Sequence, residues 1–368
     1  MFWASALAVA AIERNRSPDP RSEEPMTEGP LVSIVIPARD EERGVGAAVA
    51  SHLAQTYRRV EVIVVDDRSA DRTVAVATEA AAGDARFQCV SGAAVPDGWI
   101  GKSWACWQGA RRARGEWLLF SDADVIHTPE TLARCLALAI RLNRGGLTLT
   151  PRVETRTVAE RLVMPAAATL IANVLAPGFL VRSRRSKVVM AAGAYILVRR
   201  DVYDSLGGHE GIAGRMVDDV ALAVAVKQGG GLLVPADGTS LIHLRMYHDI
   251  SEMWRGWRKN AAFANAGEPT RGLAPALALA VLGATPLVAA VNSGRRRSGR
   301  GIALGLTGLV AQCALQRLAA PVVVTPQRYA PTLPIGTTFM AAAALCGSID
   351  RISGRGPVWR GRRYPDAR

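Results

Sequence analysis

From Leu31 onward, hydrophobic and polar residues form blocks that predict strands followed by helices. Short apolar runs rich in β-branched residues are typical of buried parallel strands, and the longer runs between them are typical of covering helices. Regular alternation of strand and helix predicts an α/β fold with a mostly parallel, doubly wound sheet. The predicted strands are residues 32–37, 60–66, 87–90, 117–121, 147–153 and 188–198, and the predicted helices are residues 42–56, 73–82, 103–114 and one with Pro129 at its first position.

Longer apolar runs interrupt and follow this pattern. Residues 164–181 lie inside the α/β region and are consistent either with a buried helix broken by a proline or with a helix that faces a membrane. Residues 273–291, 301–325 and 329–349 are each close to the roughly 20 apolar residues that a membrane span requires. The pattern divides the chain into a short apolar N-terminus and linker (1–30), an α/β domain (31–270), membrane-associated helices (271–350) and a basic tail (351–368).

Charge is concentrated near the C-terminus, because +10 of the net charge of +13 follows Val291. A basic segment beside apolar helices favours an anionic membrane surface as its partner. The chain has no basic stripe interleaved with aromatic residues and no known nucleic-acid motif, so we expect no nucleic-acid partner. Its five cysteines are scattered and odd in number, which argues against a disulfide framework or a zinc site and favours a reducing compartment.

The basic residues also suggest a membrane layout. Basic loops stay on the cytoplasmic side of a bacterial inner membrane. We therefore expect residues 273–291 to lie in the interface, residues 301–325 to cross outward, residues 326–328 to form an outer turn and residues 329–349 to return. The tail then ends in the cytoplasm, where the α/β domain also lies. The alternative is three full spans with the tail outside.

Two acidic clusters follow predicted strands. Asp66 and Asp67 end the strand 60–66, and Asp122 and Asp124 follow the strand 117–121. The carboxyl ends of parallel strands meet at one edge of a sheet, where ligands bind. An Asp-x-Asp pair there supplies oxygen ligands for a divalent cation that also binds phosphates, although aspartates at strand ends can instead cap the following helix.

Five longer segments carry a resemblance to a known family. They read VSIVIPARDEE, EVIVVDDRSADRT, GKSWACWQGARRARGEWLLFSDAD, GAYILVRRDVYDSLGGHEG and VDDVALAVAVKQGG, within residues 32–231. The chain resembles family 2 glycosyltransferases, which have the GT-A fold. The segments GWIGKSWA and VWRGRRY are similar to the membrane-associated subgroup linked to hopanoid and carotenoid glycosylation.

The resemblance implies a role for particular residues. It implies a divalent cation, Mg²⁺ or Mn²⁺, held by Asp124 and Asp122, and a general base at Asp219 beside Asp218. The residues expected to bind the nucleotide sugar are Pro37, Ala38, Glu41, Asp66, Asp67, Lys102 and Asp122, and those expected on the acceptor side are Gly193, His209, Arg255 and Arg258.

Other interpretations of these residues stay open. Lys102 can be a solvated surface lysine, and the Asp218–Asp219 pair can be an acidic helix start. The run that holds Arg255 and Arg258 can be an interfacial belt of Trp and Arg. His127 is not assigned as a ligand, and Trp107 stands where the family often has Asn.

The expected activity is an inverting, metal-dependent transfer of a sugar from a nucleotide-sugar donor, expected to be UDP-linked, to a lipid acceptor such as a hopanoid or carotenoid. One alternative is a transferase for surface polysaccharide or polyprenyl phosphate. Another is a nucleotidyltransferase, which shares the metal chemistry but leaves Asp218 and Asp219 unexplained. The alternative from a different class is a non-catalytic membrane scaffold, which has no need to keep both Asp124 and Asp219.

Overall fold

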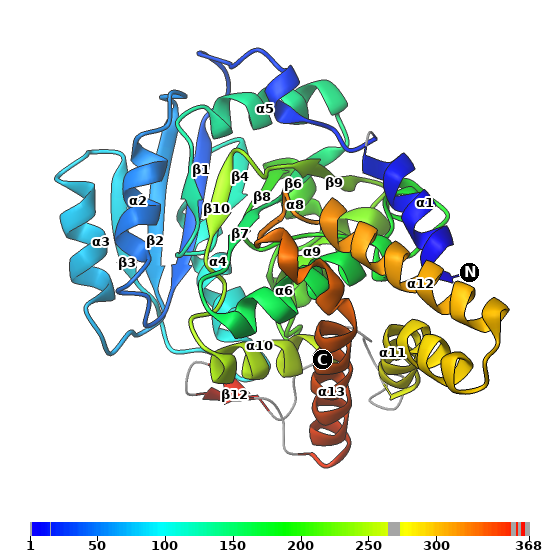
Figure 1. Ribbon diagram of the computed structural model, residues 1–368. Helices are drawn as coiled ribbons and strands as arrows, with labels where there is room; N and C mark the ends of the chain where they lie inside the picture. Colours follow the sequence, from blue (N-terminus) through cyan, green and yellow to red (C-terminus); the bar gives the residue numbers. More distant parts are fainter. Residues whose placement is uncertain (1, 15, 264–272, 355–357, 360–361, 365–368) are drawn as a thin grey trace.

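The computed structural model describes residues 2–14, 16–263, 273–354, 358–359 and 362–364. An α/β half and a helical half lie side by side (Figure 1). A seven-stranded sheet with the order β3-β2-β1-β4-β8-β6-β9 forms the centre of the α/β half. Neighbouring strands are parallel except where β8 pairs with β4 and β6. The strands are β1 (Val32–Ala38), β2 (Val60–Asp66), β3 (Phe87–Ser91), β4 (Trp117–Phe120), β6 (Gly145–Thr150), β8 (Ile196–Arg199) and β9 (Leu232–Asp237).

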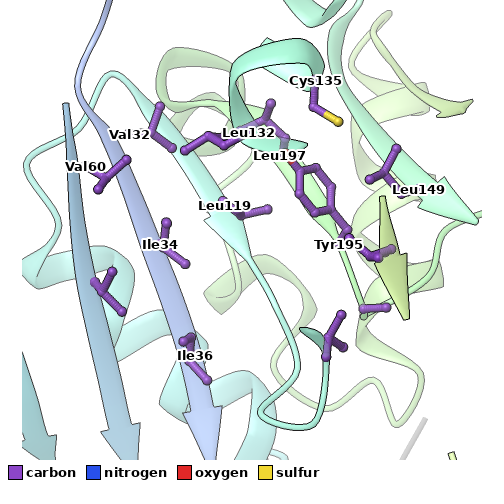
Figure 2. Close-up of a cluster of buried hydrophobic side chains, with 14 of the residues drawn as sticks. Val32, Ile34, Ile36, Val60, Leu119, Leu132, Cys135, Leu149, Tyr195 and Leu197 are labelled. Atoms are coloured by element: carbon purple, nitrogen blue, oxygen red, sulfur yellow. The ribbon is translucent and has the colours of Figure 1, made fainter. Parts of the chain in front are cut away.

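Helices cover both faces of this sheet, as the sequence predicts. Alternate strand residues point to opposite faces, so Ile34 and Leu119 pack in one core (Figure 2) while Val35 and Leu118 pack in another. The first core is covered by α2 (Val45–Leu53), α3 (Thr73–Ala81) and α5 (Thr131–Leu142), and the second by α4 (Gly101–Arg112), α8 (Arg200–Ser205) and α9 (Asp218–Gln228). The predicted doubly wound architecture is confirmed.

Several predicted boundaries are wrong, among them both ends of the helix predicted over 42–56, which is α2 (Val45–Leu53). The run 147–153 is two strands, β6 and β7 (Arg152–Glu154), because Pro151 between them has no N–H to donate to a ladder. The run 188–198 forms a strand only from Ile196 to Arg199, since its first half ends in the small residues Ala191, Ala192 and Gly193. Helix α5 begins at Thr131, so Pro129 precedes the helix instead of opening it.

A second, four-stranded sheet with the order β11-β7-β10-β5 connects the two halves. It contains β5 (Ile126–His127), β10 (Ile242–Leu244) and β11 (Val323–Val324) beside β7. The helical half contains α1 (Phe2–Arg14), α6 (Val158–Leu170), α10 (Ile250–Phe263), α11 (Leu273–Arg295), α12 (Gly299–Leu318) and α13 (Leu333–Ile352). The remaining short elements are η1 (Pro20–Ser22), η2 (Ile171–Leu175), α7 (Gly178–Arg182), η3 (Glu210–Ile212), η5 (Gln327–Thr332), β12 (Val358–Trp359) and β13 (Arg362–Arg363).

Four helical segments among the described residues are long and apolar enough to cross a membrane, judged by length and composition: residues 158–175, 276–295, 299–318 and 327–352. The first of these overlaps the run 164–181, for which the sequence leaves two interpretations. Its helix α6 is mostly buried, and the helical structure breaks at Pro177. Beyond α6, Leu175 is 59% exposed and Phe179 is 47% exposed. The run is therefore a mostly buried helix, α6, followed by the short helical elements η2 and α7, each of which exposes a large apolar side chain.

The expected outer turn at residues 326–328 follows a strand that is attached to the α/β half. Strand β11, just before this turn, pairs with β7 of the α/β half, and Val153 N donates a hydrogen bond to Val322 O at 2.6 Å. At the other end of α13, Asp350 forms an ion pair with Arg258 of α10. Both ends of α13 therefore contact other parts of the protein, and the position of this helix relative to a membrane stays a prediction.

Candidate active site

The carboxyl ends of β1 and β4 open into one pocket of about 260 Å³. Its walls also include α4, the segment before β8 and the start of α9. The lining residues are Pro37, Lys102, Cys106, Phe120, Ser121, Asp122, Gly193, Ile196, His209, Asp218, Asp219 and Leu222. Seven of the residues expected from the sequence therefore meet in one place, although they come from six separate segments of the chain.

Lys102 lies among carboxylates in this pocket. Its Nζ lies 2.7 Å from Asp122 Oδ1 and 3.5 Å from Asp218 Oδ2. Burial alone would lower the pKa of Lys102, but the negative charges of Asp122, Asp218 and Asp219 raise it well above its usual value. Lys102 is thus a fixed positive charge inside the pocket, which does not fit the alternative of a solvated surface lysine.

Asp218 and Asp219 open helix α9 and differ in their surroundings. Asp219 Oδ2 accepts a hydrogen bond from Gly193 N at 3.0 Å, and its Oδ1 accepts one from Val220 N at 2.7 Å. Burial, with the charge of Asp218 adding to it, raises the pKa of Asp219 to about 6. Burial also acts on Asp218, but Lys102 and then His209 outweigh it and lower the pKa of Asp218. At neutral pH, Asp219 is therefore the carboxylate suited to accept a proton.

The carboxylates in this pocket fit a hard divalent cation. The Asp122 side chain keeps 34% of its surface exposed, and carboxylate oxygens are the ligands that Mg²⁺ and Mn²⁺ prefer. Gly193 allows the backbone to approach closely, because a Cβ there would lie 3.0 Å from Asp122 Oδ2 and 2.8 Å from Lys102 Nζ. Asp124 is not among the lining residues; it packs against the loop after β1, where a Cβ on Gly44 would lie 3.0 Å from its Cα.

Cys106, His209 and Asp218 form a second group of possible ligands, with ligand atoms within 4.8 Å of one another. His209 already has a structural role, because its Nδ1 lies 2.8 Å from the hydroxyl of Tyr203 and its N–H donates to the same oxygen. Burial lowers the pKa of His209 to about 4 and raises the pKa of the Cys106 thiol well above its usual value. Both side chains are therefore neutral at pH 7, and contact between His209 and an acceptor stays a prediction.

The loops after β1 and β2 form the other end of the site. Asp67 N donates to Ala38 O at 2.8 Å, and Asp40 N donates to Ser69 Oγ at 3.0 Å, so the two loops hold each other. Asp40 and Arg68 have positive φ values of 52° and 60°, a backbone conformation that clusters at functional sites. Asp66 accepts a hydrogen bond from Ser69 N, which closes the turn after β2 in the manner of a cap.

Two further expected nucleotide contacts, Glu41 and Ala38, lie in or beside the same loops. Glu41 N donates to Thr73 Oγ1 at 2.8 Å, so this residue ties the loop after β1 to the start of α3. Ala38 is the last residue of β1 and is 2% exposed. Neither lines the pocket, which is centred on the ends of β1 and β4.

The basic residues of α10 differ from the expectation. Arg255 is exposed, and Arg258 pairs with Asp350 of α13, so neither is directed to the acidic pocket. Lys259, the next residue, is the one whose charge interacts with that pocket. Burial, with the charge of Lys102 adding to it, lowers the pKa of Lys259 to about 8, while Asp218, Asp219 and Asp122 oppose this shift. Contact of Arg255 and Arg258 with an acceptor therefore stays a prediction, and Lys259 is the residue of this segment that the sequence analysis did not name.

Sequence reasoning also missed a contact from the C-terminal segment. Arg362 Nη1 lies 2.5 Å from Asp67 Oδ2. The signal that could have indicated it is the run VWRGRRY, which was noted only as a mark of the subgroup. Two other residues, His127 and Trp107, make contacts that hold the fold. Buried His127 lies 3.1 Å from Ser121 Oγ. Trp107 stacks on Trp104 and does not line the pocket.

Comparison with known proteins relates the first part of the chain to a known family. The sequence matches Glycosyl transferase family 2 over residues 33–207. The 4,4'-diaponeurosporenoate glycosyltransferase of Staphylococcus haemolyticus is 30% identical over 234 residues, which cover 63% of this chain and 61% of the relative. The protein of the same name from Staphylococcus aureus (strain MRSA252) is 27% identical over 245 residues, 64% of this chain and 62% of the relative. The chain thus spans about three fifths of the length of these relatives.

A solved structure extends the comparison to the fold. A mannosyltransferase from Pyrobaculum calidifontis, in complex with GDP-Man and Mn²⁺, superimposes with a TM-score of 0.52 and 17% sequence identity. The superposition covers 96% of this chain and 99% of that protein. The fold is therefore the GT-A fold with additional helices, as the sequence predicts.

Proposed function

The chain carries a family 2 glycosyltransferase domain with the GT-A fold, and on this premise we propose that it transfers a sugar from a nucleotide-sugar donor to a lipid acceptor of the carotenoid or hopanoid class. The observation that carries this proposal is the pocket in which Lys102 and Asp122 lie beside Asp219. One side of such a pocket suits a diphosphate leaving group, and the other side suits a hydroxyl that must lose its proton.

The proposed reaction is a single displacement with inversion. The acceptor oxygen forms a bond to the anomeric carbon while the bond from that carbon to the diphosphate oxygen breaks. The proton of an acceptor hydroxyl passes to Asp219, whose pKa of about 6 keeps it ionised at neutral pH yet able to accept a proton. The nucleoside diphosphate leaves with its electron pair, and Lys102 stabilises its negative charge.

A divalent cation, Mg²⁺ or Mn²⁺, is the cofactor that this site is proposed to use. Asp122 and Asp124 would hold it, as in the motif that the chain shares with its family. When bound, the ion neutralises charge on the diphosphate. Asp122 has a second role that needs no metal, because it positions Lys102 through the 2.7 Å contact.

The proposed acceptor is supported by the names of the relatives and by the helical half. The two relatives are named for 4,4'-diaponeurosporenoate, a carotenoid acid. Helix α10 connects the two regions of this chain, since Met253 and Trp257 are buried in the helical core while Lys259 interacts with the acidic pocket. A lipid held against the helical half would thus reach Asp219 with its polar end.

The same helical half supports attachment to the cytoplasmic membrane of a bacterium, on the side where nucleotide sugars are made. Apolar side chains of α11 and α12 stay exposed, and exposed Arg295, Arg296 and Arg297 lie between these helices. The far end of α12 continues into β11, which pairs with the α/β half. If α12 crossed the bilayer, these arginines would lie outside, against the positive-inside rule. We therefore propose that α11 and α12 lie in the plane of the cytoplasmic leaflet.

The test is a transfer assay with the purified full chain in bacterial lipid vesicles. A panel of UDP- and GDP-linked sugars, Mg²⁺ or Mn²⁺, and carotenoid and hopanoid acceptors is incubated with the protein, and lipid products are identified by mass spectrometry. We expect a glycosylated lipid of inverted anomeric configuration, absent with Asp219→Asn. A product on polyprenyl phosphate or polysaccharide would assign the alternative transferase functions. If the protein neither transfers a sugar nor binds nucleoside diphosphates, the proposed enzymatic function is rejected and the non-catalytic membrane scaffold is supported.

A further inference from the structure

The C-terminal segment runs from the helical half to the nucleotide end of the candidate active site. Helix α13 ends beside α10, where Asp350 pairs with Arg258. Beyond it, β12 lies next to α10 (Figure 1) and pairs with β13, with Val358 opposite Arg363 and Trp359 opposite Arg362. Residues distant in sequence from the strand-end motifs are thereby brought to the mouth of the site.

Arg362 forms an ion pair with a buried carboxylate there. Its Nη1 lies 2.5 Å from Asp67 Oδ2, and Asp67 is 5% exposed. Gly101 makes this approach possible, because a Cβ at that position would lie 2.5 Å from Arg362 Nη1 and 2.6 Å from Asp67 Oδ2. A buried, charge-assisted hydrogen bond of this kind fixes the geometry of the carboxylate. Loss of the Arg362 guanidinium would leave only the more distant Arg39, whose Nη1 lies 3.9 Å from Asp67 Oδ2, to compensate this buried charge.

Tyr364, two residues further on, fixes the same segment at a second point. Its ring packs against Ile100 and Met216, two buried side chains that directly precede important parts of the pocket. Ile100 is followed by α4, which carries Lys102, and Met216 is followed by α9, which opens with Asp218. The C-terminal segment therefore contacts β2, α4 and the approach to α9 within three consecutive residues.

Asp67 itself has one oxygen in use and one without a partner. Oδ2 accepts the hydrogen bond from Arg362, whereas Oδ1 is buried and has no hydrogen-bond partner among the described residues. A buried carboxylate oxygen without a donor is costly, so such an atom indicates a missing donor group. The N–H of a nucleobase or the hydroxyl of a ribose is a donor of the right kind.

We propose that Arg362 is a positioning residue of the nucleotide-binding site: it holds Asp67 by Oδ2 so that Oδ1 accepts a hydrogen bond from the nucleoside of the donor. This inference rests on the proposed function, because it takes a nucleoside diphosphate as the ligand. It makes Arg362 part of the donor site, anchored by Tyr364, and gives these two residues of the run VWRGRRY a physical role.

The experiment measures UDP and GDP affinity by titration calorimetry of the full chain with Mg²⁺ or Mn²⁺, and donor KM and kcat in the transfer assay. Arg362→Gln should weaken binding of the preferred nucleotide about tenfold or more, the cost of a charged hydrogen bond, and raise KM while kcat changes less than about twofold. Arg362→Lys should recover part of the affinity. Arg363→Gln removes the same charge from the adjacent, exposed residue and should stay within about twofold of the unmodified protein.

A double variant separates positioning from a loss of folding. If Arg362 acts through Asp67, then Asp67→Asn with Arg362→Gln binds nucleotide no more weakly than Asp67→Asn alone, and the double variant melts at a temperature near that of the unmodified chain. Equal or tighter nucleotide binding by Arg362→Gln, in a protein that still transfers sugar, overturns this inference and leaves the proposed function standing. No binding of any nucleoside diphosphate by the unmodified protein overturns both.

Discussion

The two halves of this protein use apolar residues in opposite ways. In the α/β half, strand residues such as Ile34 and Val35 are fully buried, because each face of the sheet has its own helical cover. In the helical half, Leu277, Leu304 and Val310 remain 69%, 65% and 68% exposed. In the first half, the apolar side chains are covered by other residues of the same half. In the second half, apolar side chains remain on the surface, where an apolar partner can cover them. The difference indicates that chemistry and membrane contact belong to separate parts of one chain.

The same contrast applies to charge. The α/β half gathers carboxylates and Lys102 into a pocket where burial changes their pKa values, so each charge has a defined partner. The helical half carries Arg295, Arg296 and Arg297 exposed at the turn between α11 and α12. Such arginines suit a diffuse partner such as anionic lipid. The five predictions below test this division of labour.

The largest effect is expected at the proposed base. Asp219→Asn removes the proton acceptor, so transfer to a hydroxyl acceptor should fall by about two to four orders of magnitude. Nucleotide affinity should be nearly unchanged, because this carboxylate acts on the acceptor. The matched control is Asp218→Asn, one residue earlier, which should reduce transfer less. Similar mild losses from both variants would reject Asp219 as the base. A carboxylic acid acceptor, already ionised at neutral pH, should lose less activity than a hydroxyl acceptor.

A loss of roughly two orders of magnitude is expected when the proposed metal site is removed. Asp124→Asn or treatment with EDTA should each reduce transfer by this amount, with the circular dichroism spectrum and melting temperature unchanged. Activity of the EDTA-treated protein should return on addition of Mg²⁺ or Mn²⁺. Transfer by Asp124→Asn at the normal rate after EDTA treatment would contradict the metal role and leave Lys102 as the main stabiliser of the leaving group.

The pH dependence of transfer to a hydroxyl acceptor should follow Asp219. Its pKa is raised to about 6, so it is ionised and active as a base above that pH and becomes protonated below it. At pH 5 the rate should therefore be about one tenth of its value at pH 7, falling further as the pH decreases. Nucleotide affinity is measured at the same pH values. If this affinity stays constant while the rate falls, the loss of rate is due to protonation of Asp219. A flat profile from pH 5 to pH 7 would contradict the assignment.

The smallest effect on catalysis is expected from the apolar surface of the helical half. Val310→Glu places a charge on the exposed face of α12, so the protein should bind lipid vesicles several-fold less, since burying a valine side chain contributes about 1.5 to 3 kcal/mol. Nucleotide affinity should not change. Val74→Glu is the matched control in the α/β half, where Val74 of α3 is 41% exposed, and it should leave vesicle flotation unaltered. Equal effects from the two variants would remove the distinction between the halves.

The orientation of the helical half can be measured directly. Single cysteines at Ser298 and at Arg328, in a variant lacking the five natural cysteines, report the two ends of α12. If this helix lies in the plane of the cytoplasmic leaflet, an impermeant thiol reagent outside intact cells modifies neither. Modification at either position would establish a crossing helix. The transfer assay on the cysteine-free protein verifies that its fold and activity remain.

Much of the α/β half could be predicted from the order of residues, for a local reason. The pattern of apolar runs determined β1 and β2 within a residue, because a buried strand with helices on both faces needs an uninterrupted apolar sequence. Strand ends then placed Asp122 at the mouth of the sheet. The errors lie where the pattern of apolar residues is interrupted. Pro151 divides one apolar run into two strands. The run that ends at Gly193 forms no strand, because its last side chains are small.

Only the tertiary structure decided which charged groups act together. The sequence determined that Asp218 and Asp219 open a helix, but only packing against Lys102 lowers the pKa of one and leaves the other raised. The sequence also determined that α10 carries a basic run. Only the folded structure shows that Lys259 is the residue of this run whose charge interacts with the pocket. The contact of Arg362 with Asp67 joins residues 295 positions apart. Strand and helix follow from neighbours in sequence, whereas electrostatic partnership depends on distance and burial, which arise only when the whole chain folds.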